Sequence, residues 1–307
     1  YERIGSAEYL ITAEHFFSVE VARAFKPKID SCPLIALKGV LVHERTGVRS
    51  YDVNVYGVDD AFWTFHGIAA PAFPDEQSAF VGEALARQLN AQLDDGLLLR
   101  IETQQTIPRE WLYGRRDTVG RTLRLSCSRI QPEDKLGEFS LRPSQQSIHS
   151  IFVPLPYLQR ALSQASQINA ILLAGPMPGS EREFIADTLK QNCSLHDLGL
   201  RLRTLGALHS FSLESDQIII DDPTAQAAEQ AARALSLDSS PIYTYLANSI
   251  RANGREIPYS VITAADFGKG ALRSVDELKR APVPTSTNPD ELIWLTNWAS
   301  QNLNVAP

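Results

Sequence analysis

The sequence predicts an α+β fold in which a unit made of one helix and a two-stranded hairpin occurs twice. Most of the pattern between Phe16 and Asp60 appears again between Ala225 and Asp266. The matched landmarks are Ala22-Arg23-Ala24 with Ala232-Arg233-Ala234, Pro33 with Pro241, Gly47 with Gly254, Tyr51 with Tyr259, Val53 with Val261 and Asp60 with Asp266. Their offsets lie between 206 and 210 residues, and a nearly constant offset over some forty residues indicates an internal duplication.

The first copy is predicted to begin with a helix and to continue as a hairpin. Phe17, Val21 and Phe25 lie four residues apart, which is the spacing of one helical face, so a helix is expected from about 13 to 25. A strand over 6–12 precedes it. Apolar residues then fall at every second position between about 34 and 57, which indicates two half-buried strands.

The turns and the second helix also have sequence signals. Thr46-Gly47 and Asn253-Gly254 lie where a tight hairpin turn needs a positive φ. In the second copy, Asp222 is predicted to be the N-cap of a helix, with Pro223 at its first position. Both copies are therefore expected to have the same order of elements.

A separate α/β module is predicted between the two copies, over residues 76–165. Pro71 and Pro74 stiffen the segment before it, which marks a domain boundary. Strands and helices are expected in the stretches 78–90, 94–102, 121–130 and 150–162.

Beyond the module, 168–175 is predicted to be a buried strand, and Ser180 with Glu183 to form a capping box for the helix that follows. Residues 198–205 and 208–214 alternate as strands. In the tail, Leu303 and Asn304 match Leu89 and Asn90 at an offset of 214, after which the second copy stops. We expect the sequence to be a processed or excised piece of a longer protein.

Composition excludes several classes of function. The formal charge of −7 is spread along the chain, so nucleic acid and anionic membrane surfaces are not expected partners. The three cysteines are too few for a disulfide scaffold and have no metal-site spacing, so buried thiols are expected. A bridge between Cys32 and Cys127 stays open as an alternative.

The sequence contains no recognised catalytic motif. Nucleotide-binding loops, the zinc-protease motif and the nucleophile elbow are all missing, so no catalytic residue, cofactor-binding residue, cofactor or metal ligand is predicted. His43-Glu44 and His196-Asp197 are adjacent pairs at strand ends, and adjacent strand residues point to opposite faces. Asp94-Asp95 and Asp221-Asp222 are interpreted as turn and cap residues.

Two aromatic segments are candidates for contacts. Phe62, Trp63 and Phe65 are predicted to pack in the core between the hairpin and the module, with a docking role as the alternative. A second segment, Trp111-Leu112-Tyr113, lies in a long polar loop, and loops run over the surface. It is the candidate contact patch for a partner, with folding back as a lid as the alternative.

Three short motifs follow one another along the chain. A hairpin ends in Gly57-Val58-Asp59 and is followed by an aromatic segment, Asp95-Gly96 forms a turn into a strand, and Val153-Pro154-Leu155 closes the module. Together they resemble the extracytoplasmic domain of FtsX-like, MacB-type ABC transporter permeases, in which the turn has the reverse order of Asp95-Gly96. The resemblance covers residues 1–192 well and the second copy more weakly.

The resemblance implies an architecture. A discontinuous porter-like subdomain would be interrupted by a small α/β insert of the Sabre type and followed by a partial second copy. The expected parts are 1–75 and 166–214 for the porter-like subdomain, 76–165 for the Sabre-like insert and 215–307 for the truncated repeat.

The resemblance also implies a non-catalytic role in the periplasmic part of an inner-membrane protein. A cytoplasmic ATP-binding subunit would hydrolyse ATP and act through transmembrane parts, with a periplasmic or lipoprotein partner and a dimeric full-length protein as further expectations. The alternatives are a free periplasmic binding or adaptor protein, and a hydrolase whose pocket collects His43, His66 or His149 with a buried carboxylate.

Overall fold

The computed structural model describes residues 4–101, 121–143, 146–177, 179–206, 209–215, 219–265, 293 and 295–305 of the 307-residue chain. The chain divides into two compact units. The first comprises Tyr1–Gln105 and Arg116–Leu200, and the second comprises Thr106–Arg115 and Arg201–Pro307. Among the described residues, no helix combines the length and the apolar character needed to span a membrane.

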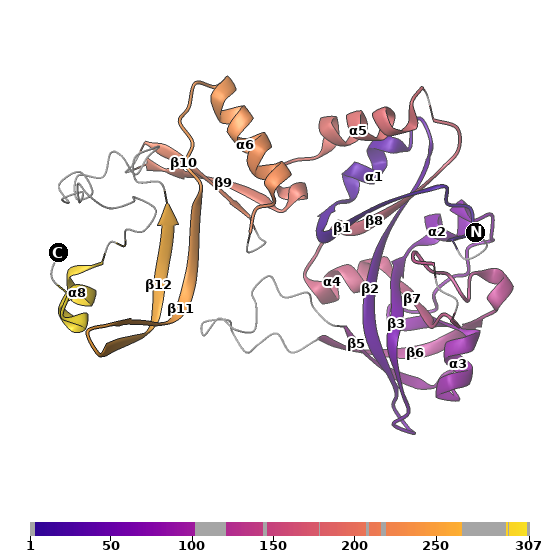
Figure 1. The fold of residues 1–307 in the computed structure, drawn as a ribbon. Coiled ribbons are helices and arrows are strands. Elements are labelled where there is room, and N and C mark those ends of the chain that lie inside the picture. Colours follow the sequence, from indigo (N-terminus) through magenta and orange to yellow (C-terminus); the bar gives the residue numbers. More distant parts are fainter. Residues whose placement is uncertain are drawn as a thin grey trace. The chain divides into compact units, whose positions relative to one another are not determined.

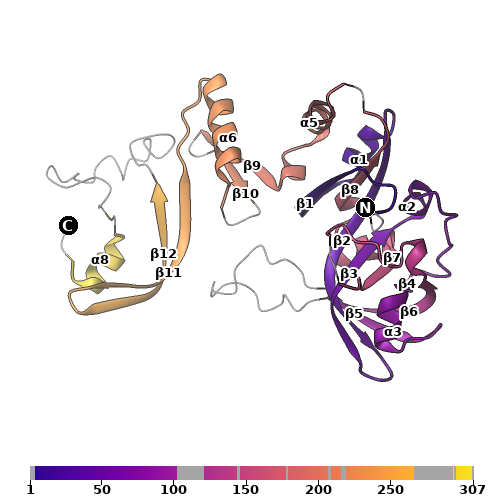
Figure 2. The ribbon, with the colours of Figure 1, turned by 45° about the vertical axis from the view of Figure 1, so that its right-hand side comes forward.

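The first unit is built on one eight-stranded mixed sheet, in which β2 and β3 run side by side (Figure 1, Figure 2). Its strands are β1 (Tyr9–Ser18), β2 (Asp30–His43), β3 (Arg49–Val58), β4 (Ser78–Gly82), β5 (Gly96–Ile101), β6 (Arg121–Gln131), β7 (Ser150–Pro154) and β8 (Gln167–Ala174). Their order is β1-β8-β2-β3-β7-β4-β6-β5, and β5 pairs again with β2. Six strands, from β2 to β5 in that order, therefore close into a ring.

Strand β2 holds the two parts of this sheet together. Residues 30–34 pair with β8, residues 35–42 pair with β3, and residues 39–43 pair with β5 on the other side. Ring closure brings β5 so near that a Cβ atom on Gly39 would lie 2.8 Å from the carbonyl oxygen of Arg100 and 3.3 Å from Val55 Cγ2. A glycine is needed at this position because the backbones approach closely.

Five helices cover the sheet of the first unit. They are α1 (Val19–Phe25), α2 (Asp60–Phe65), α3 (Glu83–Leu89), α4 (Leu155–Leu162) and α5 (Glu181–Asn192). Helices α1, α3, α4 and α5 contribute to a large aliphatic core, whereas α2 contributes Phe62 and Trp63 to a smaller aromatic core. The predicted burial of these two aromatic side chains is confirmed, and Phe65 packs at the edge of the same cluster.

Aromatic rings hold the smaller core together. The Phe62 ring stands edge-on to Trp63, with 5.2 Å between the centroids, and edge-on to Phe139 at 5.1 Å. Phe152 of β7 stacks on Tyr56 of β3 at 5.6 Å. These separations fall in the range where edge-to-face and stacked pairs are attractive, so α2 is anchored across two strands.

Three local predictions are wrong. The helix expected from about 13 begins at Val19, because β1 continues to Ser18, whose side chain accepts a hydrogen bond from the Glu20 N–H. Phe17 is instead buried on the sheet opposite Ile168. The capping box at Ser180 does not form, since Ser180 makes no side-chain cap bond. The N-cap of the second-copy helix is Asp221, one residue before the predicted Asp222.

The strands predicted for the insert at 76–165 are present. They are β4, β5, β6 and β7, and they pair with β2 and β3 in the same closed ring. The insert and its boundaries remain a prediction.

The described residues of the second unit form two separate two-stranded sheets and two helices. Its elements are β9 (Leu200–Leu205), β10 (Ser210–Ser215), α6 (Asp222–Ala234), β11 (Ile242–Ala252), β12 (Arg255–Ala265) and α8 (Asn297–Leu303). The hairpin β11–β12 turns at Asn253 and Gly254, with φ of 51° and 73°, as predicted. The order of helix and hairpin matches that of α1, β2 and β3, and the duplication remains an interpretation. Asp266 lies outside the described residues.

Replacing Gly39 by alanine should weaken the first unit. The added methyl group meets backbone rather than a movable side chain, so Gly39→Ala is expected to lower the free energy of unfolding by roughly 1–3 kcal/mol. Urea unfolding followed by tryptophan fluorescence measures it. Gly206→Ala is the matched control, because a Cβ atom there has no neighbour within 4 Å. Equal stability of the two variants would contradict the proposed role of Gly39.

Candidate functional site

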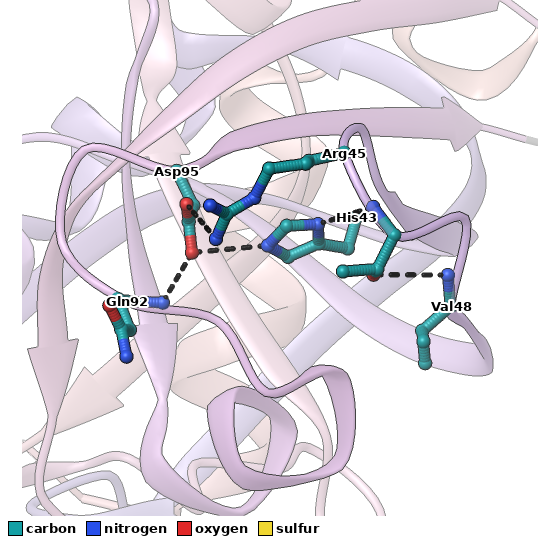
Figure 3. A network of polar contacts seen from close by, with 6 residues as sticks. His43, Arg45, Val48, Gln92 and Asp95 are labelled. Atoms are coloured by element: carbon teal, nitrogen blue, oxygen red, sulfur yellow. Dashed lines mark hydrogen bonds and ion pairs between the residues drawn. The ribbon is translucent and has the colours of Figure 1, made fainter.

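The end of β2 and the turn before β5 share a buried polar network (Figure 3). His43 Nε2 lies 3.1 Å from Asp95 Oδ2, and the Thr46 backbone N–H donates to His43 Nδ1 at 3.2 Å. Since Nδ1 accepts a hydrogen bond, Nε2 carries the ring proton and donates to the carboxylate. The side chain of His43 is 0% exposed.

Asp95 is held by further donors. The Gln92 N–H donates to its Oδ2 at 2.7 Å, and the Arg45 guanidinium lies 3.5 Å from its Oδ1. The Gln92 amide and then His43 hold the pKa of Asp95 below its usual value. A general base must reach the proton that it removes, whereas both ring nitrogens of His43 are occupied inside the protein. The network therefore joins the hairpin to β5, and His43 has no ring nitrogen free to act as a base.

The turns on either side of this network are local features, whereas the contact between His43 and Asp95 is not. The prediction that Glu44 is a strand residue is wrong, because β2 ends at His43 and Glu44 lies in the turn, where it pairs with Arg124 at 2.8 Å. Asp94 is a turn residue with φ of 65°. The partner of His43 is Asp95, 52 residues away, and no local pattern connects the two.

The pair His196-Asp197 is structural as well. Asp197 is buried and accepts hydrogen bonds from the Ser18 N–H at 2.6 Å and from the Ser194 hydroxyl at 2.6 Å. Burial raises the pKa of Asp197, but the hydrogen bonds from Ser194 and Ser18 outweigh this effect and bring the pKa below its usual value. His15 Nε2 lies 2.8 Å from the Asp197 carbonyl oxygen. These bonds fix the start of α1 against the segment after α5.

His66 lies at the end of α2, among aromatic rings. Its centroid is 4.8 Å from that of Phe62 and 5.5 Å from that of Phe139. The Ser6 N–H donates to Nδ1 at 3.0 Å, and among the described residues the buried Nε2 has no hydrogen-bond partner. Burial lowers the pKa of His66 to about 4. The imidazole is neutral at physiological pH and ties the N-terminal segment to the aromatic core.

His149 lines a polar cavity of about 420 Å³ together with Lys38, Asp52 and other residues of this face. Its Nδ1 lies 3.3 Å from the Ser50 hydroxyl, and burial lowers the pKa of His149. Ser50 is fully buried and donates its hydroxyl proton to Gln88 Oε1 at 2.9 Å. An activated serine needs its base as the proton acceptor, so this contact lacks the arrangement of a nucleophile.

The three histidines of the hydrolase alternative are thus in three different places. His43 bonds Asp95, His66 packs among aromatic rings and His149 faces the polar cavity. A second cavity, of about 440 Å³, is mainly apolar and lies between β1, α1 and the segment around Asp197. No described pocket collects these histidines with a buried carboxylate.

The cysteines are buried or partly buried thiols. Cys32 and Cys127 are both free, so the alternative of a bridge between them is wrong. Burial raises the pKa of Cys32 far above its usual value and that of Cys127 to about 11, which makes both thiols poor nucleophiles. Across the described ranges, no group of three or more metal-binding side chains comes together.

The two main sequence motifs meet in the fold. Strands β3 and β7 are parallel, and Gly57 lies opposite Val153 while Val58 lies opposite Pro154. A Cβ atom on Gly57 would lie 2.8 Å from Leu158 Cδ2 and 3.4 Å from Leu155 Cδ1, so the glycine lets α4 pack directly on β3.

Asp59 ends the first motif and caps the next helix. Its carboxylate accepts a hydrogen bond from the Ala61 N–H at 3.0 Å, at the start of α2. The motif residues therefore determine how α2 and α4 leave two neighbouring strands. Trp111, Leu112 and Tyr113, the predicted contact patch, lie outside the described residues.

Comparison with solved structures finds similar chains, among them the two domains described next. No protein-family model matches the chain, and no curated protein matches it. The periplasmic region of MacB from Actinobacillus actinomycetemcomitans is similar at 11% identity and a TM-score of 0.37, over 72% of this chain and 91% of that one. The extracellular domain of the noncanonic ABC-type transporter YknZ from Gram-positive bacteria is similar at 9% identity and a TM-score of 0.35, over 67% and 98%. The chain resembles both domains.

The pKa of His66 predicts a loss of stability in acid. Its folded value of about 4 lies below the unfolded value of about 6.5, so between these values the unfolded protein binds more protons. The contribution of the neutral ring to the free energy of unfolding is complete above pH 6.5 and is lost as the pH falls to 4. Because the ring is partly exposed, we expect a loss on the order of 1–2 kcal/mol.

Urea unfolding at pH 7, 6, 5 and 4 measures this loss. The variant His66→Phe keeps an aromatic ring among Phe62 and Phe139 and removes the titration, so its stability should fall less over the same interval. All other titratable groups are common to the two proteins. The difference between their losses of stability therefore reports the titration of His66. Parallel curves for the two proteins would show that His66 does not cause the acid sensitivity.

Proposed function

We propose that the chain is a non-catalytic extracytoplasmic domain of an ABC transporter permease of the FtsX-like, MacB type. In this role it would couple conformational change, driven by a cytoplasmic ATP-binding subunit through transmembrane parts of the full protein, to the handling of a substrate or partner outside the cytoplasmic membrane. ATP hydrolysis belongs to the separate subunit.

The junction of the two motifs is the observation that carries this proposal. Gly57-Val58-Asp59 and Val153-Pro154-Leu155 are separated by almost a hundred residues, and they lie on adjacent positions of two parallel strands. Gly57 allows Leu155 and Leu158 to pack on β3, so each motif needs the other. This mutual need supports reading them as one family signature rather than as two chance matches.

The closed ring suits a mechanical role. Each of its six strands pairs on both sides, so the ring can transmit a displacement without deforming at a free edge. A coupling domain must have at least two arrangements relative to its neighbours, and ligands or nucleotide state then shift their populations. Because the unit is internally rigid, a change in these populations would move the whole domain.

Localisation of the full-length protein in its own cells tests the proposal. A permease domain remains in the membrane pellet after osmotic shock and a high-salt wash, whereas a free periplasmic binding or adaptor protein is released by the shock. We expect the membrane pellet. Release of the full-length protein into the shock fluid would favour the adaptor and overturn the permease.

Cysteine labelling of intact cells tests the side of the membrane. In a Cys193→Ser background, Tyr51→Cys places a thiol at a residue that is 64% exposed, and it should react with a membrane-impermeant maleimide before lysis. Val55→Cys is the matched control on the same strand, because Val55 is fully buried and should react only after denaturation. Labelling of Tyr51→Cys only after lysis would place the domain in the cytoplasm.

A further inference from the structure

The hairpin β11–β12 resembles the hairpin β2–β3, but its apolar side chains are much more exposed to solvent. At an offset of 208 residues, Ile242 corresponds to Leu34 and Val261 to Val53. Leu34 and Val53 are fully buried, whereas Ile242 is 58% exposed and Val261 is 66% exposed. Apolar residues exposed on both strands of an isolated hairpin indicate a surface that binds something.

Helix α8 resembles α3, the helix that packs on the first hairpin. Helices α3 and α8 are both seven residues long, and each is followed by a C-cap asparagine, Asn90 or Asn304, with φ of 52°. The next N–H, of Ala91 in one and Val305 in the other, bonds to a carbonyl five residues earlier at 2.9 and 3.0 Å. Helix α3 packs on β3 and α8 on β12, the second strand of each hairpin.

In the first unit, the element after α3 completes the hairpin. Strand β5 follows a short turn and pairs antiparallel with residues 39–43 of β2. The corresponding residues of β11, at an offset of 208, are 247–251. Within the described part of the chain, β11 pairs with β12 alone, so its outer edge presents backbone donors and acceptors.

The charge at this edge indicates what would bind there. In the first unit, the turn before β5 supplies Asp95, which contacts His43 and Arg45 at the end of the hairpin. Arg251 takes the place of His43 at the offset of 208, and its side chain is 73% exposed while it contacts Glu256 at 3.1 Å. A cation at this position complements a strand that begins with an acidic residue.

We propose that the outer edge of β11 is an acceptor site for an added antiparallel β-strand. The partner is an extended peptide segment with the chemistry of β5: an acidic turn residue followed by apolar residues at alternate positions. Main-chain hydrogen bonds along 247–251 provide binding, and the acidic residue opposite Arg251 sets the register. The site depends on the second unit alone and not on the assignment to a transporter.

A strand attached to the chain itself tests the site. We extend the chain after Pro307 by a copy of residues 94–101, which places the strand as far from Leu303 of α8 as β5 and its turn lie from Leu89 of α3. Attachment to the chain raises the effective concentration of the strand. In the control extension, serine replaces the copies of Leu97, Leu99 and Ile101, the three positions that are buried in β5.

Hydrogen exchange of the backbone amides of 247–251 is the measurement. The strand-bearing extension should slow exchange by about tenfold or more relative to the unextended chain, since an edge amide becomes hydrogen-bonded, and the serine extension should leave it unchanged. Equal exchange in the three proteins overturns the proposal. Protection of the unextended chain, with a dimer in sedimentation, would assign the edge to a second copy of the chain and also overturn it.

Discussion

The first unit depends on the ability of β2 to hydrogen-bond with three strands. Its first residues pair with β8, and the stretch around Gly39 lies between β3 and β5. The missing side chain of Gly39 lets the Arg100 carbonyl approach and so allows the ring to close. Closure then places His43 against Asp95, and it gives α3 and α4 a continuous surface to cover.

The sequence predicts well those elements that local chemistry determines. Asn253-Gly254 forms a two-residue turn because both residues accept positive φ, and the alternation in 121–130 gives β6. The spacing of Phe17 to Val21 predicts a helix, whereas pairing with Ile168, far along the chain, keeps Phe17 in a strand. Contacts of that kind cannot be derived from a local period, since tertiary pairing overrides propensity.

In the candidate sites, too, local features can be predicted from the sequence and long-range contacts cannot. A turn role for Asp94 follows from local geometry and is found, whereas Glu44 lies in the turn after β2 and not in the strand. The bond between His43 and Asp95 requires ring closure, which no spacing in the sequence reveals. The motif residue Gly57 was recognised by resemblance, but the physical reason for it, the close approach of Leu158, comes only from the arrangement of β3 and α4.

The pairing of β1 with β8 has a consequence for how the chain folds. Tyr9 lies opposite Leu173, so β1 has no partner until almost the whole first unit has been synthesised. Contacts between residues so distant in sequence are slow to form, and an unpaired strand can aggregate before its partner is made. A cell that makes this chain must therefore keep β1 from associating with other chains until β8 has emerged.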